Sequence, residues 1–225
     1  MNVIEQIHSE AFKEGSFEYM PEDLQGWMDM QSFPRFFEES VCKRAGGEPL
    51  LIIEVGSWKG LSACLMASIL KTSNIRGKII AIDTWLGSPE HMGSTQIGER
   101  RLGVPRLYEQ FISNVYHKKL QDIIYPFPIS SVQGGYYLEQ ANIKADIIYI
   151  DAGHEYEAVK LDLEVFWRIL KEGGHMLMDD YNWEGVRRAM EEFSSKEGIK
   201  YIVSGNVIKI EKPYKIDKDS MKKIL

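Results

Sequence analysis

The stretch LLIIEVGSWKG, Leu50 to Gly60, decides the class of fold. Its first part, Leu50–Val55, is a short apolar run interrupted only by Glu54, and it ends at Gly56. Runs of this kind are typical of a β-strand that is covered on both faces. Gly56 permits a tight exit from the strand and Gly60 permits a close approach of the helix that the next residues predict.

The same alternation of strand and helix continues along the chain. Strand-like runs recur at KIIAID, IIYPF, DIIYI and GGHMLMDDY, the last of them beginning after the pair Gly173-Gly174, and KYIVSGNVIKIE predicts a closing hairpin. We expect helices over 61–70, 106–117, 132–141 and 156–170, and a further helix in NWEGVRRAMEEFSS with Asn182 as its N-cap. Alternating strands and helices predict a parallel sheet with helices on both sides, and the hairpin makes the last strand antiparallel. The predicted fold is therefore α/β, a Rossmann-like, doubly wound, seven-stranded sheet, mostly parallel with an antiparallel last strand.

The regular pattern covers only part of the chain. We expect an N-terminal helical or lid segment at 1–45, a main domain at 46–212 and a peripheral, lysine-rich tail at 213–225. The aromatic and methionine residues of 17–37 and the Gly-rich loop 86–105, with His91, are candidates for a lid over a site. Ordinary core or oligomer contacts explain the aromatic residues of the first segment equally well.

Composition excludes several classes of function. The chain of 225 residues has a net charge of −6, which gives no basic surface for nucleic acid or for an anionic membrane. Its two cysteines have no metal-ligand spacing and favour a reducing compartment. No signal peptide and no apolar run of about 18 residues is found, so a cytoplasmic location is expected.

Two acids mark the nucleotide-binding end of the predicted sheet. Glu54 lies at the end of a buried strand, where a carboxylate is costly without a partner. Asp83 ends the second strand, where an acid can accept both ribose hydroxyls of a nucleoside. The glycines alone are a weak signal, because a glycine turn of this kind occurs in many α/β proteins.

Three further acids predict a metal site at the same edge. Asp151 ends the fourth strand, and Asp179 and Asp180 end the fifth. Because neighbouring strands lie about 4.8 Å apart, the carboxylates should converge and repel one another unless a cation lies among them. An all-oxygen set suits Mg²⁺, or less selectively Mn²⁺ or Ca²⁺. The alternative for Asp179 or Asp180 is a helix N-cap.

His154 follows Asp151 by three residues, in a loop at the ligand-binding edge. A histidine in this position is a candidate general base, although a lone histidine is more often a surface or packing residue. Tyr156 and Lys160 match the Y-x-x-x-K pair of short-chain dehydrogenases. The turn E-V-G-S-W-K-G lacks the glycine spacing of those enzymes, and successive turns of one helix explain the pair.

The motifs EVGSWKGLS, IDTWLGS and YIDAGHEYEAVKLDL…GGHMLMDDY together resemble the class I S-adenosylmethionine-dependent methyltransferases, and within them the metal-dependent macrocin-type and sugar O-methyltransferases of natural-product biosynthesis. The similarity spans roughly residues 50 to 211. One departure from the broad class is Trp58, which occupies the position of the central glycine of the first motif.

The resemblance implies roles for individual residues. S-adenosylmethionine would have its methionine part surrounded by Glu54, Gly56, Ser57, Gly60 and Ser62, its ribose held by Asp83, its nucleoside lined by Thr84 and Trp85, and its adenine near Ser130 and Ser131. The metal, Mg²⁺ or Mn²⁺, would be held by Asp151, Asp179 and Asp180, and His154 would be the base.

The expected reaction is methyl transfer to a hydroxyl of a small molecule, most readily a sugar or glycosylated metabolite, by a homo-oligomeric enzyme with no nucleic-acid or membrane partner. A metal ion lowers the pKa of the acceptor hydroxyl, and the base removes its proton. Two alternatives are a catechol- or phenol-type O-methyltransferase, whose base is usually a lysine, and a non-catalytic nucleoside-binding protein of the same fold.

Overall fold

The computed structural model describes residues 3–15 and 18–214. The strands of the main sheet are β1 (Leu50–Val55), β2 (Gly77–Asp83), β5 (Ile124–Pro128), β6 (Ala145–Ile150), β7 (Leu170–Met178), β8 (Tyr201–Ser204) and β9 (Val207–Glu211). The helices are α1 (Val3–Ala11), α2 (Ser32–Arg44), α3 (Leu61–Thr72), α4 (Leu107–His117), α5 (Ser131–Gln140), α6 (Tyr156–Ile169) and α7 (Glu184–Glu197). The loop after β2 contains the 3₁₀ turns η1 (Pro89–His91) and η2 (Thr95–Ile97) and the short hairpin β3 (Arg100–Arg101) and β4 (Val104–Pro105).

The main sheet confirms the predicted fold class. Its strand order is β5-β2-β1-β6-β7-β9-β8, and its pairs are parallel except where β9 pairs with β7 and β8. The chain moves outward from β1 in one direction and then returns to the other side of β1 with β6. Such a reversal of strand order is where open α/β sheets bind ligands, at the carboxyl ends of the strands.

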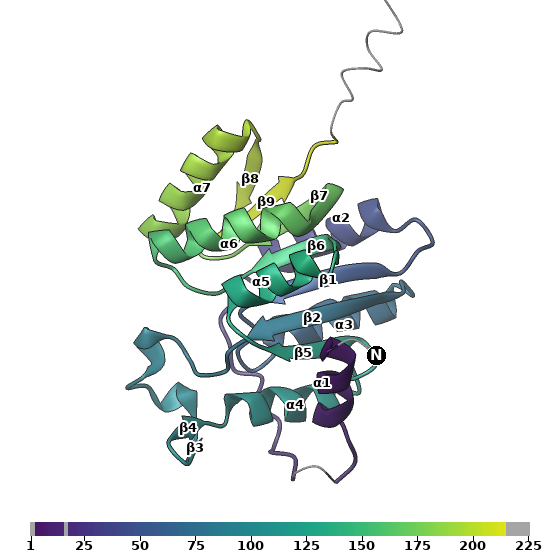
Figure 1. Ribbon diagram of the computed structural model, residues 1–225, viewed down its shortest axis with the longest axis vertical. Helices are drawn as coiled ribbons and strands as arrows, with labels where there is room; N and C mark the ends of the chain where they lie inside the picture. Colours follow the sequence, from purple (N-terminus) through teal and green to yellow (C-terminus); the bar gives the residue numbers. More distant parts are fainter. Residues whose placement is uncertain (1–2, 16–17, 215–225) are drawn as a thin grey trace, which may run out of the picture.

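Two layers of helix cover the sheet (Figure 1), with α5 and α6 in front of it and α3 behind. Side chains on a strand alternate between the faces, so each strand supplies both cores. Ile52 joins the cluster that contains Phe37 of α2 and Met66 of α3, whereas Ile53 joins the cluster that contains Leu163 of α6. This period of two explains why the buried strands read as continuous apolar runs.

Two predicted boundaries are wrong. Strand β7 begins at Leu170, ahead of the glycine pair. A register shift accommodates the additional residues of β7, since Leu170 pairs with Ala145 of β6 and His175 pairs with Ile147. Asn182 does not cap α7. Trp183 holds that position with an extended backbone, and Asn182 lies one residue too early, in the turn that leaves the sheet.

Residues 18–31, here called the N-terminal strap, have no helix or strand and lie against α4. The backbone N–H of Met20 donates to Ser113 Oγ (2.9 Å), and that of Asp23 donates to Asn114 Oδ1 (3.0 Å). The Asp23 carboxylate accepts from Lys59 Nζ (2.7 Å), whose side chain is only 6% exposed. The strap is therefore fixed to the turn that follows β1.

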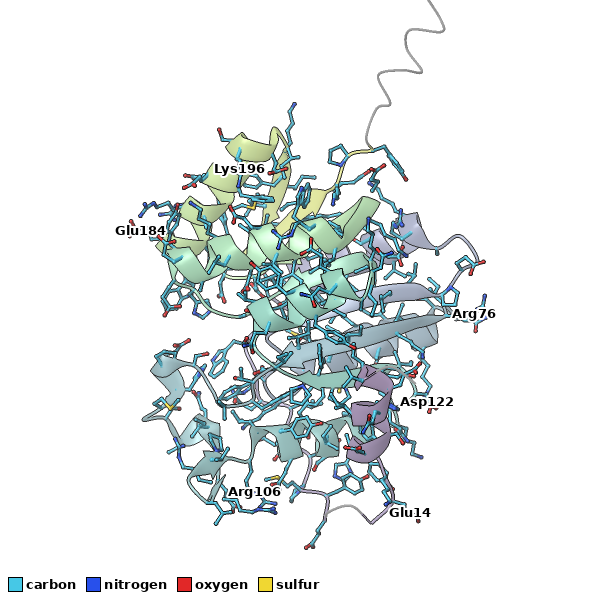
Figure 2. All side chains as sticks on the ribbon, viewed as in Figure 1. Glu14, Arg76, Arg106, Asp122, Glu184 and Lys196 are labelled. Carbon is cyan, nitrogen blue, oxygen red and sulfur yellow. The ribbon has the colours of Figure 1, made fainter. Side chains whose placement is uncertain are left out.

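The predicted tail lies mostly outside the described residues, as does Phe17. Tyr214 is described, and its hydroxyl lies near Gly173. Figure 2 shows the side chains of the described residues on the same view. No helix among the residues that the structure describes is long and apolar enough to cross a membrane.

The closest backbone approach at the carboxyl edge is between Gly56 and Asp151. Gly56 has φ +84, and a Cβ built on it would lie 1.9 Å from the carbonyl oxygen of Asp151. The amide N–H of Asp151 in turn donates to the carbonyl of Val55 (2.8 Å). Only glycine permits this spacing between the ends of β1 and β6.

We expect Gly56→Ala to destabilise the fold by at least about 3 kcal/mol, because the methyl group would force two strand ends apart. Gly47→Ala is the matched control. Gly47 also has positive φ (+91) but has open space around its Cβ, so it should cost only about 1 kcal/mol. Urea denaturation of both variants tests this, and equal losses would show that backbone strain, not contact, governs Gly56.

Candidate active site

A cavity of about 470 Å³ lies at the carboxyl ends of β1, β2 and β6, at the point where strand order reverses. Its wall is formed by the strap, the turn after β1, the loop after β2, the start of α5 and the loops after β6 and β7. The predicted site residues that line it are Gly56, Ser57, Ser62, Asp83, Thr84, Ser130, Ser131, Asp151, His154 and Asp180. The predicted residues that do not line it are Glu54, Gly60, Trp85 and Asp179.

Asp83 organises the turn after β1. Its Oδ2 accepts the backbone N–H groups of Ser57 (2.9 Å) and Trp58 (2.8 Å), and its Oδ1 accepts that of Trp85 (2.7 Å). Burial raises the pKa of Asp83 above its ordinary value, against the opposing effect of these three donors. The prediction that Asp83 holds the ribose stays a prediction.

Glu54 lies behind the cavity wall, because the alternation of side chains along β1 points it toward α3. It is fully buried, and its two oxygens accept the hydroxyls of Ser57 and Ser62, each at 2.5 Å. Burial raises the pKa of Glu54 to about 7. Glu54 thus meets its predicted need for partners, and it orients two serines that do line the cavity.

Gly60 and Trp85 pack against side chains of α4 and do not line the cavity. Gly60, at φ +89, lies where a Cβ would be 3.0 Å from the ring of Phe111 on α4. Trp85 is 2% exposed, packs on Tyr108 and Phe111, and donates its indole N–H to the carbonyl of Trp58 (2.8 Å). Both residues therefore shape the turn that faces the ligand from behind.

An aromatic cluster of Trp27, Trp58 and His91 forms part of the wall. The ring of His91 lies 4.9 Å from that of Trp27 and 4.6 Å from that of Trp58, centroid to centroid. Trp58 also donates its indole N–H to Gln25 Oε1 (3.1 Å). The lid prediction supplied the sequence signal for two of these residues, because it named His91 and the aromatic residues of 17–37, among them Trp27. Phe33, Phe36 and Phe37, which belong to the same predicted lid segment, are instead buried in the core, as the alternative of ordinary core contacts expected.

Asp151 and Asp179 share one hydroxyl. Tyr149 Oη donates toward Asp151 Oδ2 and Asp179 Oδ2, each at 3.1 Å. Burial, followed by the negative charges of Asp179 and Asp180, raises the pKa of Asp151 well above its ordinary value. Burial also raises the pKa of Asp179. The predicted repulsion among the carboxylates is thus present, and it makes this cluster receptive to a cation or to a proton.

His154 lies between two carboxylates. Its Nε2 is 2.8 Å from Asp180 Oδ2 and its Nδ1 is 3.5 Å from Glu90 Oε1. The hydrogen bond that His154 donates to Asp180 raises the pKa of His154 above its ordinary value, ahead of the opposing effect of burial. The ring of Trp183 stacks on His154 at 4.6 Å. Asp180 reaches the ring because its own backbone is left-handed (φ 65).

The fit of a metal ion is partial. Asp151, Asp179 and Asp180 are the hard oxygen donors that Mg²⁺ or Mn²⁺ prefers. However, no three His, Cys, Asp or Glu side chains within 3–15 and 18–214 are grouped so that they could hold a metal ion. Asp180 faces His154, and the other two carboxylates face Tyr149. The metal site stays a prediction.

The dehydrogenase alternative fails on geometry. Tyr156 and Lys160 both bind Glu192 on α7, with Lys160 Nζ 2.7 Å from Glu192 Oε1, and they do not line the cavity. Tyr156 and Lys160 lie on successive turns of α6 and contact the neighbouring helix α7, as the simpler interpretation expected.

Comparison with known proteins decides the family. Residues 53–181, more than half of the chain, match the sequence model of a family described as "Methyltransferase domain". The chain belongs to this methyltransferase family. The match begins in β1 and ends just after Asp180, so it contains both ends of the cavity. The sequence-based identification as a class I S-adenosylmethionine-dependent methyltransferase is confirmed.

Solved structures of methyltransferases share the fold. The O-methyltransferase NovP superposes with a TM-score of 0.62 at 18% identity, over 93% of this chain and 88% of that chain. CalS11, described as a TDP-rhamnose 3'-O-methyltransferase, superposes with a TM-score of 0.53 at 16% identity, over 80% of this chain and 76% of that chain. At such identities the likeness shows the fold alone.

Among curated proteins, the chain is 26% identical over 148 residues to the uncharacterized protein R132 of Acanthamoeba polyphaga mimivirus. The matched region is 64% of this chain and 57% of that protein, so it spans little more than half of the relative's length.

Glu54 gives the ligand-free protein a testable pH dependence. The pKa of Glu54 rises from 4.5 to about 7 on folding. Below pH 4.5 the side chain is protonated in both states and its burial costs no ionisation free energy, and the fold loses stability as the pH rises from 4.5 through 7. Glu54→Gln keeps the shape and removes the charge. At pH 8.5 we expect the variant to gain up to roughly 3 kcal/mol relative to wild type, with little gain at pH 5. Denaturation at both pH values tests this, and a pH-independent difference would contradict it.

Proposed function

We propose that the protein is a divalent-metal-dependent O-methyltransferase that uses S-adenosylmethionine to methylate a hydroxyl of a small molecule, with sugars or glycosylated metabolites as the acceptor class. The observation that carries the proposal is one continuous cavity. It is lined at the same time by Asp83 and Ser131, at the predicted nucleoside end, and by Asp151, Asp180 and His154 at the predicted chemical end.

The cavity has the size and composition that a nucleoside cofactor requires. Its volume falls within the usual range of about 300–1,000 Å³ for small-molecule sites. Thr84, Ser130 and Ser131 supply polar groups at the nucleoside end, and Ser57 and Ser62 supply hydroxyls beside the first turn of α3. The N-terminus of that helix offers free N–H groups for a carboxylate.

His154 is the residue placed to move the proton. As the acceptor oxygen forms its bond to the methyl carbon and the carbon–sulfur bond breaks, His154 takes the hydroxyl proton and S-adenosylhomocysteine is released. Nε2 is held by Asp180 and Nδ1 faces Glu90, so one of these carboxylates has to give way before the ring can accept a proton. Trp183 keeps the imidazole plane fixed by stacking.

Asp151, Asp179 and Asp180 are the residues that would hold a divalent cation. When bound, such an ion supplies Lewis acidity that favours the ionised form of an acceptor hydroxyl. Asp180 then has two candidate partners, the ion and His154, so its position links the metal site to the base. The acceptor class is supported by the resemblance of the sequence motifs to those of the sugar O-methyltransferases.

Metal binding is expected to be measurable without turnover. In the presence of S-adenosylhomocysteine, Mn²⁺ titrated into the wild-type protein should give the electron paramagnetic resonance signal of a bound ion. Asp151→Asn, Asp179→Asn and Asp180→Asn should each weaken Mn²⁺ binding by about tenfold or more, because each removes a charged ligand. Asp122→Asn, at an exposed acid labelled in Figure 2, is the control and should bind as wild type.

Calorimetry should show that these variants still bind S-adenosylhomocysteine, because its expected contacts lie on β1 and β2. A wild-type protein that binds no Mn²⁺, or aspartate variants that bind it as tightly as the control, would remove the metal from the proposal. Methyl transfer that survives EDTA would do the same.

His154→Ala is expected to lower kcat by roughly 10²–10⁴ on any hydroxyl acceptor that supports turnover in a panel of sugars and phenols. Binding of S-adenosylmethionine should stay within about twofold, since the imidazole contacts the acceptor. His154→Gln keeps a hydrogen-bonding group that cannot accept the proton, so it should be nearly as slow. Near-normal turnover by His154→Gln would assign the histidine to positioning only. If the wild-type protein binds the cofactor but transfers no methyl group, a non-catalytic nucleoside-binding role is favoured.

A further inference from the structure

The acidic side chains that line the cavity are not matched by lysine or arginine. Four carboxyl side chains line it, those of Asp83, Glu90, Asp151 and Asp180. No lysine or arginine lines it within the described part of the chain. Lys59, next to Trp58 in sequence, is committed to an ion pair with Asp23 at 2.7 Å behind the wall.

Glu90 is the acid that neither the cofactor nor the predicted metal accounts for. It lies on η1, 3.5 Å from Nδ1 of His154, and its side chain is 41% exposed. An acceptor whose hydroxyl reaches His154 therefore lies beside a carboxylate. A phosphate or diphosphate in that position would meet repulsion from Glu90, and no lysine or arginine among the described lining residues offsets it.

Two tryptophans of the wall are half-exposed. Trp27 of the strap is 51% exposed and Trp183 before α7 is 49% exposed, and both line the cavity. Trp183 stacks on the candidate base, and Trp27 stacks on His91. Half-exposed indole rings in a cavity wall provide flat apolar surfaces on which a ring can lie.

We propose that the acceptor is an uncharged or cationic compound with a ring that lies against Trp27 and Trp183, and that Glu90 excludes phosphate-bearing and nucleotide-linked acceptors. This inference rests on the proposed function and narrows its acceptor class. Trp27, Trp183 and Glu90 are then residues that determine specificity. The shared chemistry is a ring with an apolar face and a free hydroxyl, and both pyranosides and phenols have it.

Binding of small probes to protein saturated with S-adenosylhomocysteine tests the proposal, because the occupied nucleoside end cannot capture them. The probes are methyl β-D-glucopyranoside, catechol and α-D-glucose 1-phosphate, followed by saturation-transfer difference NMR. The first and third are both glucopyranosides and differ only at the anomeric carbon, in its substituent (methoxyl or phosphate) and in its configuration. Each titration is made with Mg²⁺ and with EDTA, so that an effect of the ion on the phosphate is separated from that of the protein.

We expect at least one neutral probe to bind and α-D-glucose 1-phosphate to show no saturable binding. Preference between methyl β-D-glucopyranoside and catechol then distinguishes a sugar from a phenol acceptor. Trp27→Ala and Trp183→Ala should weaken the bound neutral probe by roughly three- to tenfold, while the phenylalanine variants keep most of its affinity. Tyr136→Ala, which removes a similarly exposed ring outside the cavity, is the control and should have no effect. Glu90→Arg should gain binding of α-D-glucose 1-phosphate.

Three outcomes would overturn the inference while leaving the proposed function intact: equal or tighter binding of the phosphate probe, tryptophan variants that match the Tyr136→Ala control, or no neutral probe bound although S-adenosylhomocysteine binds. If calorimetry shows that S-adenosylhomocysteine itself does not bind, the proposed function and this inference both fall.

Discussion

The contact between Gly56 and the backbone of Asp151 is the constraint on which the site depends. With no side chain on Gly56, the ends of β1 and β6 can meet at the point where strand order reverses. The turn after β1 lines the predicted cofactor end of the cavity, and the residues after β6 line its predicted chemical end. A wider separation would leave two half-sites with the methyl donor out of reach of the acceptor, because group transfer requires near contact between the reacting atoms.

Sequence alone predicted the sheet well because its signals are local. Continuous apolar runs, glycine turns and acids at strand ends all follow from burial and backbone geometry within a few residues. The same reasoning placed His154, Asp151 and Asp180 at one edge, and they line one cavity. Glu54 and Asp179 do not line the cavity: alternation along β1 points Glu54 toward α3, and Asp179 lies against the hydroxyl of Tyr149.

Other features of the site depend on contacts that are distant in sequence. Trp27 lies at the cavity in a strap that is held by α4 and by Lys59. The aromatic residues of 17–37 are lid candidates as a group, but no local pattern in this irregular segment singles out Trp27. Trp183, and not Asn182, is the N-cap residue of α7, although asparagine is preferred at that position. The turn after Asp180 determines where α7 begins, since the backbone N–H of Trp183 donates to the carbonyl of Asp180. In both cases tertiary packing overrides local preference, and the result is an aromatic wall around the candidate base.

The strap also constrains how the protein is made. Its far end is held by Asp29, whose carboxylate accepts the backbone N–H of Asn206 (3.2 Å), in the turn between the last two strands. A ribosome that adds about 5–20 residues per second needs on the order of 10 s to reach that partner after Asp29 has been made. During this interval the ring partners of Trp27, which are Trp58 and His91, are already made, but the partner of Asp29 is not. The strap is therefore held at both ends only near the end of synthesis, after Trp183 has joined the wall.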